Sequence, residues 1–257
     1  MPMLMGQAPS RVARMLSIII PTFNEEKYIT YLLDSIFAQS YRNYEIIIID
    51  AQSTDGTMKV LRRIAGSLSQ SSFAVPFSFH QVGFRNVSRQ KNFGASFAKG
   101  SVLLFIDADM ILPNPHFLYR MMKDMENSAI VAATCCLNST NQKAKYRIAD
   151  FFLNSFISAL NKSGFAVARG GIQFVRRFAF DRIHGFNERS AVAEDIEFSR
   201  RVSRYGKIFY DGKVFALESD RRYRKEGYVR TILSWSINGI WCFLFQKSLY
   251  KRWKPVR

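Results

Sequence analysis

The amino-acid sequence predicts an α/β protein with a mostly parallel central sheet and helices on both faces. Short, continuously apolar segments rich in Ile, Val and Leu alternate with longer segments of helical pattern, and polar residues directly follow several of the apolar segments. Strands without polar alternation are buried on both faces, as in parallel sheets covered by helices. With 257 residues, 48% of them hydrophobic, the chain can bury a large core. Disorder as its main state is therefore excluded.

The first half of the chain shows the alternation most clearly. Its predicted strands are residues 16–20, 45–50, 76–81 and 101–107. Its predicted helices, each placed between two strands, are residues 25–39, 55–65 and 88–99. Gly100 follows the third helix directly and is a predicted C-terminal cap.

The second half is less regular. Its predicted strands are residues 128–136, 171–176 and 208–210, and its predicted helices are residues 145–160 and 193–205. No internal repeat, low-complexity stretch or clear linker interrupts it. We therefore expect one α/β domain over residues 1–220 and a helical, amphipathic appendage over residues 221–257.

The positive charge is concentrated near the C-terminus. The chain has 37 Lys and Arg against 20 Asp and Glu, a formal charge of +17. Residues 221–257 contain ten Lys and Arg and one acid, so this segment alone carries +9. Such a segment favours anionic partners: nucleic acid, phosphate-bearing ligands or an acidic membrane surface.

Several protein classes lose their support. Three cysteines, two of them adjacent, form neither a disulfide framework nor a zinc-binding spacing, which predicts a reduced, intracellular protein. The apolar run at residues 16–20 stops at Pro21 and is too short for a secretory signal. Residues 231–245 are mostly apolar, but a membrane span needs about 20 residues. We expect no conventional transmembrane helix.

Three polar clusters follow predicted strands, at the edge where open α/β sheets bind ligands. They are residues 21–25, Asp50, and the acidic pair Asp107 and Asp109. Two carboxylates one residue apart can hold a hard divalent cation while a diphosphate supplies further oxygens. The pair therefore predicts a divalent-cation site. A solvated turn at the pair, a loop cap at Asp50 and a helix cap at residues 24–25 are the alternatives.

Other catalytic signatures are missing. No Gly-x-Gly-x-x-Gly follows the first strand and no Gly-Lys-Ser/Thr loop occurs, so dehydrogenases and P-loop NTPases lose their main support. His80, His116 and His184 are scattered and form no zinc pattern. No Gly-x-Ser-x-Gly elbow is present either.

Six motifs occur in a characteristic order between residues 15 and 212. They are the segments 17–25, 49–57, 89–100, 104–109, 170–188 and 194–195. Through them the chain resembles the inverting family 2 glycosyltransferases of GT-A fold. The resemblance implies a nucleotide-sugar donor, linked to UDP or GDP, and a divalent metal cofactor, Mn²⁺ or Mg²⁺.

The resemblance also implies roles for matching residues. At the base and ribose of the nucleotide it places Pro21, Thr22, Asn24, Glu25 and Asp50, and on the donor side Arg89, Asn92 and Ala108. It assigns Asp107 to ribose or metal and Asp109 to metal. Around the sugar and acceptor it places Gly170, Gly171 and Glu194, with Asp195 as the general base. One departure is Ala51, where many relatives carry a second acid that contacts the base, so the choice between UDP and GDP stays open.

The C-terminal segment suggests two further functions. Arg221, Arg222 and Arg224 are placed to clamp a diphosphate, because guanidinium groups pair bidentately with phosphate oxygens. A solvated charge run is the alternative. Residues 228–254 mix aromatic and basic side chains, which favours a helix lying in an anionic membrane interface. Packing on the domain or at a homodimer contact is the alternative.

These features together predict a metal-dependent inverting glycosyltransferase, peripheral on the cytoplasmic face of a membrane. It would move a sugar to a hydroxyl or phosphate acceptor that is lipid-linked or part of a glycan. A soluble enzyme with a small-molecule or protein acceptor is one alternative. A non-catalytic basic module for anionic lipid or nucleic acid is another. The intact acids speak against the module, and the chain has no recognisable RNA-binding motif, so no nucleic-acid partner is expected.

Overall fold

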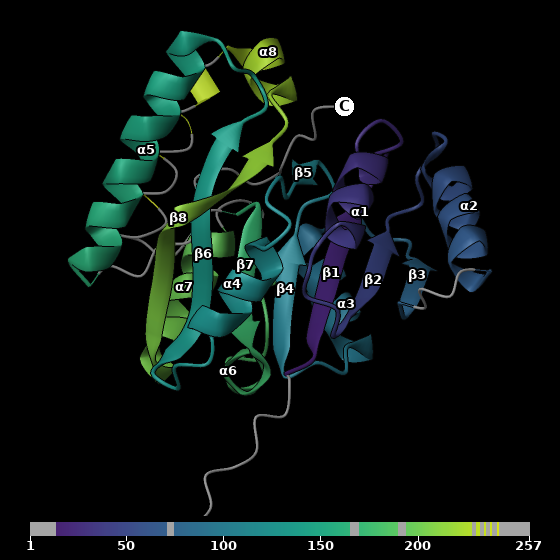
Figure 1. Cartoon of the computed structure of the whole chain (residues 1–257), viewed down its shortest axis with the longest axis horizontal. Helices are drawn as coiled ribbons and strands as arrows, with labels where there is room; N and C mark the ends of the chain where they lie inside the picture. Colours follow the sequence, from purple (N-terminus) through teal and green to yellow (C-terminus); the bar gives the residue numbers. More distant parts are fainter. Residues whose placement is uncertain are drawn as a thin grey trace, which may run out of the picture.

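The computed structural model describes residues 14–70, 75–164, 170–189 and 194–227, and five positions between residues 230 and 241. Within these residues one eight-stranded sheet runs through the molecule in the order β3-β2-β1-β4-β7-β6-β8-β5 (Figure 1). Four parallel strands form one half of it: β1 (Leu16–Thr22), β2 (Tyr44–Asp50), β3 (Phe77–Gln81) and β4 (Val102–Ile106).

The other half of the sheet is mixed. Its strands are β5 (Met110–Ile111), β6 (Ile130–Ser139), β7 (Ile172–Arg176) and β8 (Lys207–Glu218). Strand β7 runs antiparallel to both β4 and β6, β8 runs parallel to β6, and the short β5 is antiparallel to β8. The mostly parallel α/β fold is thus confirmed.

Helices cover both faces because neighbouring strand residues point to opposite sides. The residues of β1 show this: Ile18 belongs to one apolar core and Ile19 to another. The helices over the first core are α1 (Ile29–Phe37), α2 (Thr57–Ser69) and α4 (Phe117–Asp124). Those over the second are α3 (Val87–Phe97), α6 (Arg177–Arg182) and α7 (Glu194–Val202) (Figure 1). Helix α5 (Ala144–Lys162) packs against β6 and β8.

Several elements differ from the sequence predictions because their signals are short or interrupted. Helices α4 and α6 and strand β5 were not predicted, and each has eight residues or fewer. Helix α8 (Arg221–Glu226) lies at the start of the predicted helical appendage. The 3₁₀ turn at Ser203–Tyr205 ends the predicted helix 193–205 early. Strand β8 was predicted only at residues 208–210. In the structure the register with β6 shifts just beyond them, between Cys135 and Cys136, and the strand continues.

The predicted cap at Gly100 was wrong. Helix α3 ends at Phe97 with Ala98 as its C-cap, and Gly100 lies in the connection to β4. A Cβ atom at Gly100 would lie 2.6 Å from the Met15 carbonyl oxygen and 2.7 Å from the Ser17 nitrogen. Glycine is required here because the connection passes against the backbone of β1.

The predicted appendage over residues 221–257 is described only at its start and at isolated positions. Helix α8 covers its first six residues. Most of the predicted interfacial stretch, residues 228–254, lies outside the described residues. Within the described ranges, none of the helices combines the length and apolar character that a bilayer span requires.

Candidate active site

The loops after β1 and β2 form one wall at the carboxyl edge of the sheet. Thr22 and Asp50 are register partners at the ends of these strands, and both are buried. Asp50 Oδ2 accepts a hydrogen bond from the Ser53 backbone N–H (2.9 Å), and Asp50 Oδ1 accepts one from the Ser53 hydroxyl. Asp50 therefore organises its own loop, as the capping alternative supposed. Its contact with a nucleotide stays a prediction.

Asn24 connects this loop to the first one. Its backbone has a positive φ of 54°. Its backbone N–H donates to the Ser53 hydroxyl (2.8 Å), and its side-chain carbonyl accepts from the Thr54 N–H (2.8 Å). Asn24 does not cap α1, whose N-cap is Tyr28. The residue joins two loops that the sequence separates, and so shapes the wall next to Pro21 and Thr22.

An acidic centre bridged by an arginine lies at the end of β4. Asp107 and Asp109 follow the strand, on either side of the buried Ala108, and Glu25 approaches from the first loop. Arg221 of α8 donates to both carboxylate oxygens of Glu25, at 2.7 and 2.9 Å. The same guanidinium lies 3.0 Å from Asp109 Oδ2. A cation from the C-terminal segment therefore already bridges two predicted site carboxylates.

The three predicted clamp residues behave differently. Arg221 points into the acidic centre, whereas Arg222 forms an ion pair with Glu226 at 3.0 Å along α8. Arg224 pairs with Asp220 at 3.0 Å and its side chain is 61% exposed. Arg221 thus contacts carboxylates of the predicted site. A diphosphate clamp formed by these arginines stays a prediction.

A buried lysine connects the acidic centre to α7. Lys91 of α3 is 1% exposed, and its Nζ lies 3.1 Å from Glu194 Oε1. Its charge also acts on Asp107 and Asp195, and these carboxylates raise its pKa against the effect of burial. Lys91 lies within the motif of residues 89–100, and the sequence alone predicts no role for it. Its helical spacing from the small residues Ser88 and Ala95 is the signal that it faces the sheet.

Asp195, at the start of α7, has an unusual electrostatic environment. Burial and the neighbouring Glu194 charge together raise its pKa to about 7, against the opposing effect of the Lys91 ammonium. Burial likewise raises the pKa of Asp107 to about 7, with Lys91 opposing. A carboxylate that titrates near neutrality can act as a proton acceptor or donor. The predicted base and one predicted metal ligand therefore share a single lysine counter-charge.

The two predicted glycines leave space beside these groups. A Cβ atom at Gly170 would lie 3.2 Å from Asp195 Oδ2, and one at Gly171 would lie 3.0 Å from the Met110 sulfur. The Gly171 carbonyl also accepts the Asp107 backbone N–H at 3.0 Å. Both glycines therefore adjoin the acids, and their contact with a sugar or acceptor stays a prediction.

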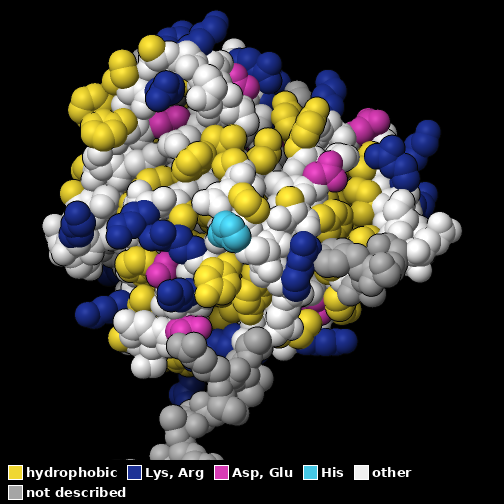
Figure 2. All heavy atoms as spheres, in the orientation of Figure 1, with side chains coloured by type: hydrophobic (Ala, Val, Ile, Leu, Met, Phe, Trp, Pro, Cys, Tyr) yellow, Lys and Arg dark blue, Asp and Glu magenta, His cyan; other side chains and the backbone are white. Residues whose placement is uncertain are grey.

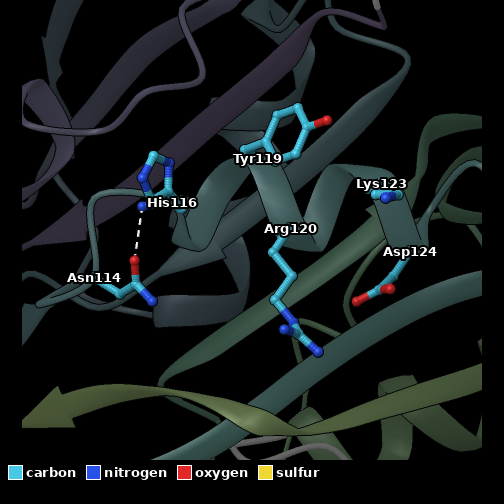
Figure 3. A pocket seen from close by; sticks show the side chains of 6 residues that line it. All are labelled: Asn114, His116, Tyr119, Arg120, Lys123 and Asp124. Carbon is cyan, nitrogen blue, oxygen red and sulfur yellow. Dashed lines mark hydrogen bonds between the residues drawn. The ribbon is translucent and has the colours of Figure 1, made fainter.

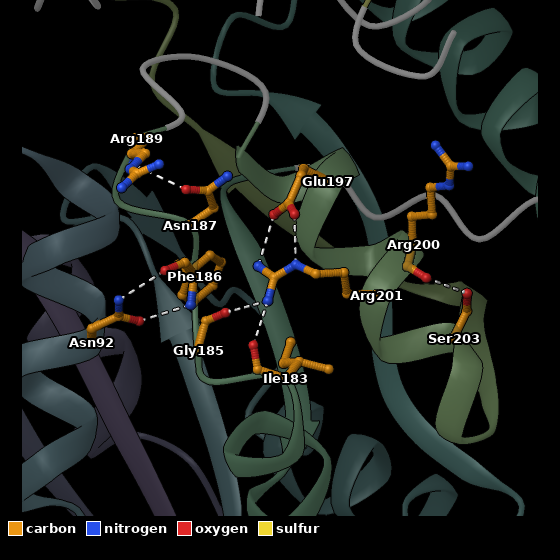
Figure 4. Close-up of polar contacts among 10 residues, drawn as sticks. All are labelled: Asn92, Ile183, Gly185, Phe186, Asn187, Arg189, Glu197, Arg200, Arg201 and Ser203. Carbon is orange, nitrogen blue, oxygen red and sulfur yellow. Dashed lines mark hydrogen bonds and ion pairs between the residues drawn. The ribbon is translucent and has the colours of Figure 1, made fainter. Parts of the chain in front are cut away.

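Asn92 and Arg89 hold the segment that leads to α7. The Asn92 side chain accepts from the Phe186 N–H (2.8 Å) and donates to the Phe186 carbonyl (2.9 Å) (Figure 4). Arg89 lies 4.0 Å from Glu188 and stacks 4.1 Å above the Phe84 ring. These contacts have a structural role, and a direct contact of either residue with a donor stays a prediction.

Arg201 makes contacts on the other side of the chain segment that leads to α7. It forms a bidentate ion pair with Glu197, at 2.6 and 2.7 Å, within α7. It also donates to the carbonyls of Ile183 (2.6 Å) and Gly185 (2.8 Å), as Figure 4 shows. The helix that carries Asp195 is thus locked to the chain segment before it. Sequence reasoning did not identify this residue.

A polar depression lies elsewhere, on α4. Its lining residues are Asn114, His116, Tyr119, Arg120, Lys123 and Asp124 (Figure 3). Arg120 is held there by Asp211, at 2.6 Å. The depression contains none of the predicted site residues.

The acidic centre fits a hard divalent cation. Mn²⁺ and Mg²⁺ prefer carboxylate and phosphate oxygens. Within the described residues no three His, Cys, Asp or Glu side chains converge on one point, so Asp107 and Asp109 would need further ligands from a bound diphosphate. The guanidinium between Glu25 and Asp109 shows that this position attracts positive charge.

Comparison with known proteins agrees with this geometry. The family model for glycosyl transferase family 2 matches residues 17–184. The chain belongs to glycosyl transferase family 2. The matched residues include both loops, the acidic pair and the glycines, and end before α7.

Three relatives illustrate the range of the family. A dolichyl N-acetyl-alpha-D-glucosaminyl phosphate 3-beta-D-2,3-diacetamido-2,3-dideoxy-beta-D-glucuronosyltransferase from Methanococcus voltae is 57% identical over 51 residues, 19% of this chain and 16% of that protein. A PGL/p-HBAD biosynthesis glycosyltransferase from Mycobacterium bovis is 30% identical over 193 residues, 74% of this chain and 70% of that protein.

The third relative is a solved structure. A mannosyltransferase from Pyrobaculum calidifontis, in complex with GDP-Man and Mn²⁺, superimposes with a TM-score of 0.67 at 21% identity. The superposition covers 82% of this chain and 60% of that chain. The chain thus spans less than two thirds of the Pyrobaculum and Methanococcus proteins. The similarity confirms the predicted GT-A fold.

Proposed function

We propose that this chain is an inverting glycosyltransferase that moves a sugar from a nucleotide-diphosphate donor to a hydroxyl or phosphate acceptor. One observation carries the proposal: Asp107 after β4 and the α7 acids Glu194 and Asp195 lie around one buried lysine, Lys91. This arrangement provides a cation-binding side and a proton-accepting side within one site. The names of the relatives support the same reaction class.

On the donor side, transfer breaks the bond between the anomeric carbon and the diphosphate. A Mn²⁺ or Mg²⁺ ion held by Asp107 and Asp109 would supply Lewis-acid stabilisation of the leaving phosphate charge. Arg221, 3.0 Å from Asp109, can form bidentate hydrogen bonds to phosphate oxygens beside it. The loops around Asn24 and Asp50 would hold the nucleoside, which is linked to UDP or GDP.

On the acceptor side, Asp195 is the proposed general base. It takes the proton of the acceptor hydroxyl as the oxygen attacks the anomeric carbon from the face opposite the diphosphate, which inverts the configuration. Its pKa of about 7 allows it to be ionised at neutral pH and still accept a proton. Gly170 and Gly171 leave room there for the sugar and the acceptor. A phosphate acceptor is already ionised and does not need the base.

We further propose that the acceptor is lipid-linked and that the protein is peripheral on the cytoplasmic face of a membrane. The charge of +9 over residues 221–257 supports attraction to anionic headgroups. The Methanococcus relative is named for an acceptor sugar on dolichyl phosphate. In this proposal residues 1–220 form the transferase domain, and residues 221–257 contribute Arg221 to the site and a membrane contact.

Ligand-induced thermal stabilisation tests the donor side. The protein is screened against UDP- and GDP-linked sugars with Mn²⁺, because a ligand that binds only the folded state raises its stability. We expect one nucleotide-sugar to raise the melting temperature, and Asp109→Asn to reduce that rise. Release of nucleoside diphosphate with a polyprenyl-linked acceptor then measures transfer. No stabilisation by any donor, or full turnover by Asp109→Asn, would refute the proposal.

A further inference from the structure

Helix α5 carries polar residues on the face that packs on the sheet and apolar residues on its outward face. Its inward face is partly polar: Asp150 accepts a hydrogen bond from the Ser139 backbone N–H at 2.8 Å. Asn154 accepts from the Leu137 N–H at 3.2 Å and donates to the Leu137 carbonyl at 3.1 Å. These side chains satisfy backbone groups of β6 beyond its pairing with β7, which covers only residues 132–133. Polar residues on this helix are therefore buried for a structural reason.

The outward face of α5 is aromatic and exposed. Ile148, Phe151, Phe152 and Phe156 are 58%, 68%, 66% and 60% exposed. The rings of Phe151 and Phe152 lie edge to face, 5.8 Å apart. Figure 2 shows hydrophobic side chains gathered at the upper left, where α5 lies in Figure 1. Contiguous exposed apolar surface on a soluble domain marks a binding surface, whereas single exposed residues are ordinary.

The charged side chains at both ends of α5 are basic. The exposed residues Lys143, Lys145 and Arg147 lie at the start of α5, and Lys162 lies at its end. The only acid of the helix is the buried Asp150. Aromatic and aliphatic side chains flanked by cations match the boundary of an anionic bilayer, where apolar groups enter the acyl region and cations meet the headgroups.

The aromatic face is connected to the candidate active site. Just before α5, Asn141 donates to Asp220 Oδ2 at 2.9 Å, and Asp220 is the N-cap of α8. The next residue, Arg221, reaches the acidic centre. Tyr146 of α5 also lies 6.4 Å from the Tyr223 ring of α8. A surface bound through α5 would therefore hold the site at a fixed position near its lipids.

We propose that the exposed face of α5 docks on an anionic lipid bilayer, with Phe151, Phe152 and Phe156 inserted at the acyl boundary. This inference rests on the proposed membrane-peripheral transferase function and adds a second contact, within the α/β domain, to the C-terminal one. The two contacts would orient the site toward a lipid-linked acceptor.

Vesicle co-sedimentation of the full chain tests the proposal. The probes are vesicles of phosphatidylcholine and phosphatidylglycerol in equal parts, and vesicles of phosphatidylcholine alone. The test variant is Phe151→Ser/Phe152→Ser/Phe156→Ser. The matched control, Tyr31→Ser/Tyr119→Ser/Phe178→Ser, removes three aromatic residues that are 61%, 55% and 51% exposed on other helices. We expect the test variant to lose at least about tenfold in partition coefficient on anionic vesicles. The control should bind like the wild type.

The remaining outcomes separate this inference from the proposed function. Equal vesicle binding by wild type and test variant, with donor-induced stabilisation intact in both, overturns the α5 inference and leaves the transferase proposal standing. If no nucleotide-sugar donor stabilises the wild type, the transferase proposal itself is overturned. A wild-type dimer that the test variant converts to a monomer in sedimentation velocity assigns the face to a second copy and overturns the bilayer inference. Unchanged melting temperatures confirm that both variants fold.

Discussion

Replacement of Glu194 by Gln should move the pH dependence of glycosyl transfer to lower pH. Burial and the Glu194 charge raise the pKa of Asp195 to about 7. If ionised Asp195 is the base, kcat/KM with a hydroxyl acceptor rises about tenfold between pH 6 and pH 8, because kcat/KM reports ionisation in the free enzyme. A neighbouring carboxylate typically contributes about one pKa unit or more, about 1.4 kcal/mol. Glu194→Gln should therefore raise kcat/KM at pH 6 about fivefold relative to its value at pH 8.

The same groups predict a pH-dependent stability. The folded-state pKa of Asp195 lies above the usual value of 3.8, so the folded protein binds the proton more tightly than the unfolded chain. The associated stability is fully present below about pH 4 and is lost as the pH rises through about 7. Asp195→Asn removes this titration, so the free energy of unfolding of the variant should fall less over this range. Urea denaturation at several pH values measures the difference.

The Glu194→Gln prediction for glycosyl transfer is measured by initial-rate kinetics, with saturating Mn²⁺ and the donor identified by thermal stabilisation. Asp195→Asn is the reference, with turnover lowered at every pH and donor affinity retained. If the pH of half-maximal kcat/KM is the same in Glu194→Gln as in the wild type, Glu194 does not raise the pKa of the base Asp195. Full activity in Asp195→Asn would remove Asp195 from the reaction.

Two further predictions concern stability. Arg221→Gln leaves the carboxylates of Glu25 and Asp109 without their shared guanidinium, so without metal the free energy of unfolding should fall by about 2–3 kcal/mol. Mn²⁺ should then stabilise this variant more than the wild type, as measured by urea denaturation with Mn²⁺ or EDTA. Gly100→Ala places a Cβ where the Met15 carbonyl oxygen lies only 2.6 Å away, and should cost about 2 kcal/mol in the same assay.

Arg221→Gln and Gly100→Ala each have a matched control variant. Arg224→Gln removes an equal charge from the exposed surface of α8, and should change stability by less than about 1 kcal/mol. Gly66→Ala, in α2, meets no atom within 4 Å and should be neutral or stabilising by up to about 1 kcal/mol. Stability losses of the same size in test and control variants would contradict both explanations.

Local pattern predicted most of the sheet correctly. β1, β2, β3, β4 and β7 lie within two residues of their expected bounds. The clearest of them, β1, β2 and β4, are buried parallel strands, which appear as unbroken apolar runs. The missed elements are short, such as α6, or are interrupted by a bulge, as β8 is at Gly212. A bulge depends on the partner strand and leaves no periodic signal in its own sequence.

The site was predictable as a set of motifs at one sheet edge, but not as a network of contacts. Lys91 faces a cluster of acids because α3 packs on β1 and β2. Arg221 reaches Glu25 across 196 positions of sequence. Asn24, considered as a helix cap, instead bonds to the loop after β2. Each of these pairings depends on the path of the chain.

From its own residues the chain specifies the strand and helix alternation, the acidic pair at a strand end and the excess of positive charge, because these are properties of neighbours in sequence. Tertiary structure alone brings Arg221 to the acidic centre, gives Lys91 its three carboxylates and turns the aromatic side of α5 outward. These features arise from long-range contacts, in which burial and the charges of distant residues set each side chain's environment.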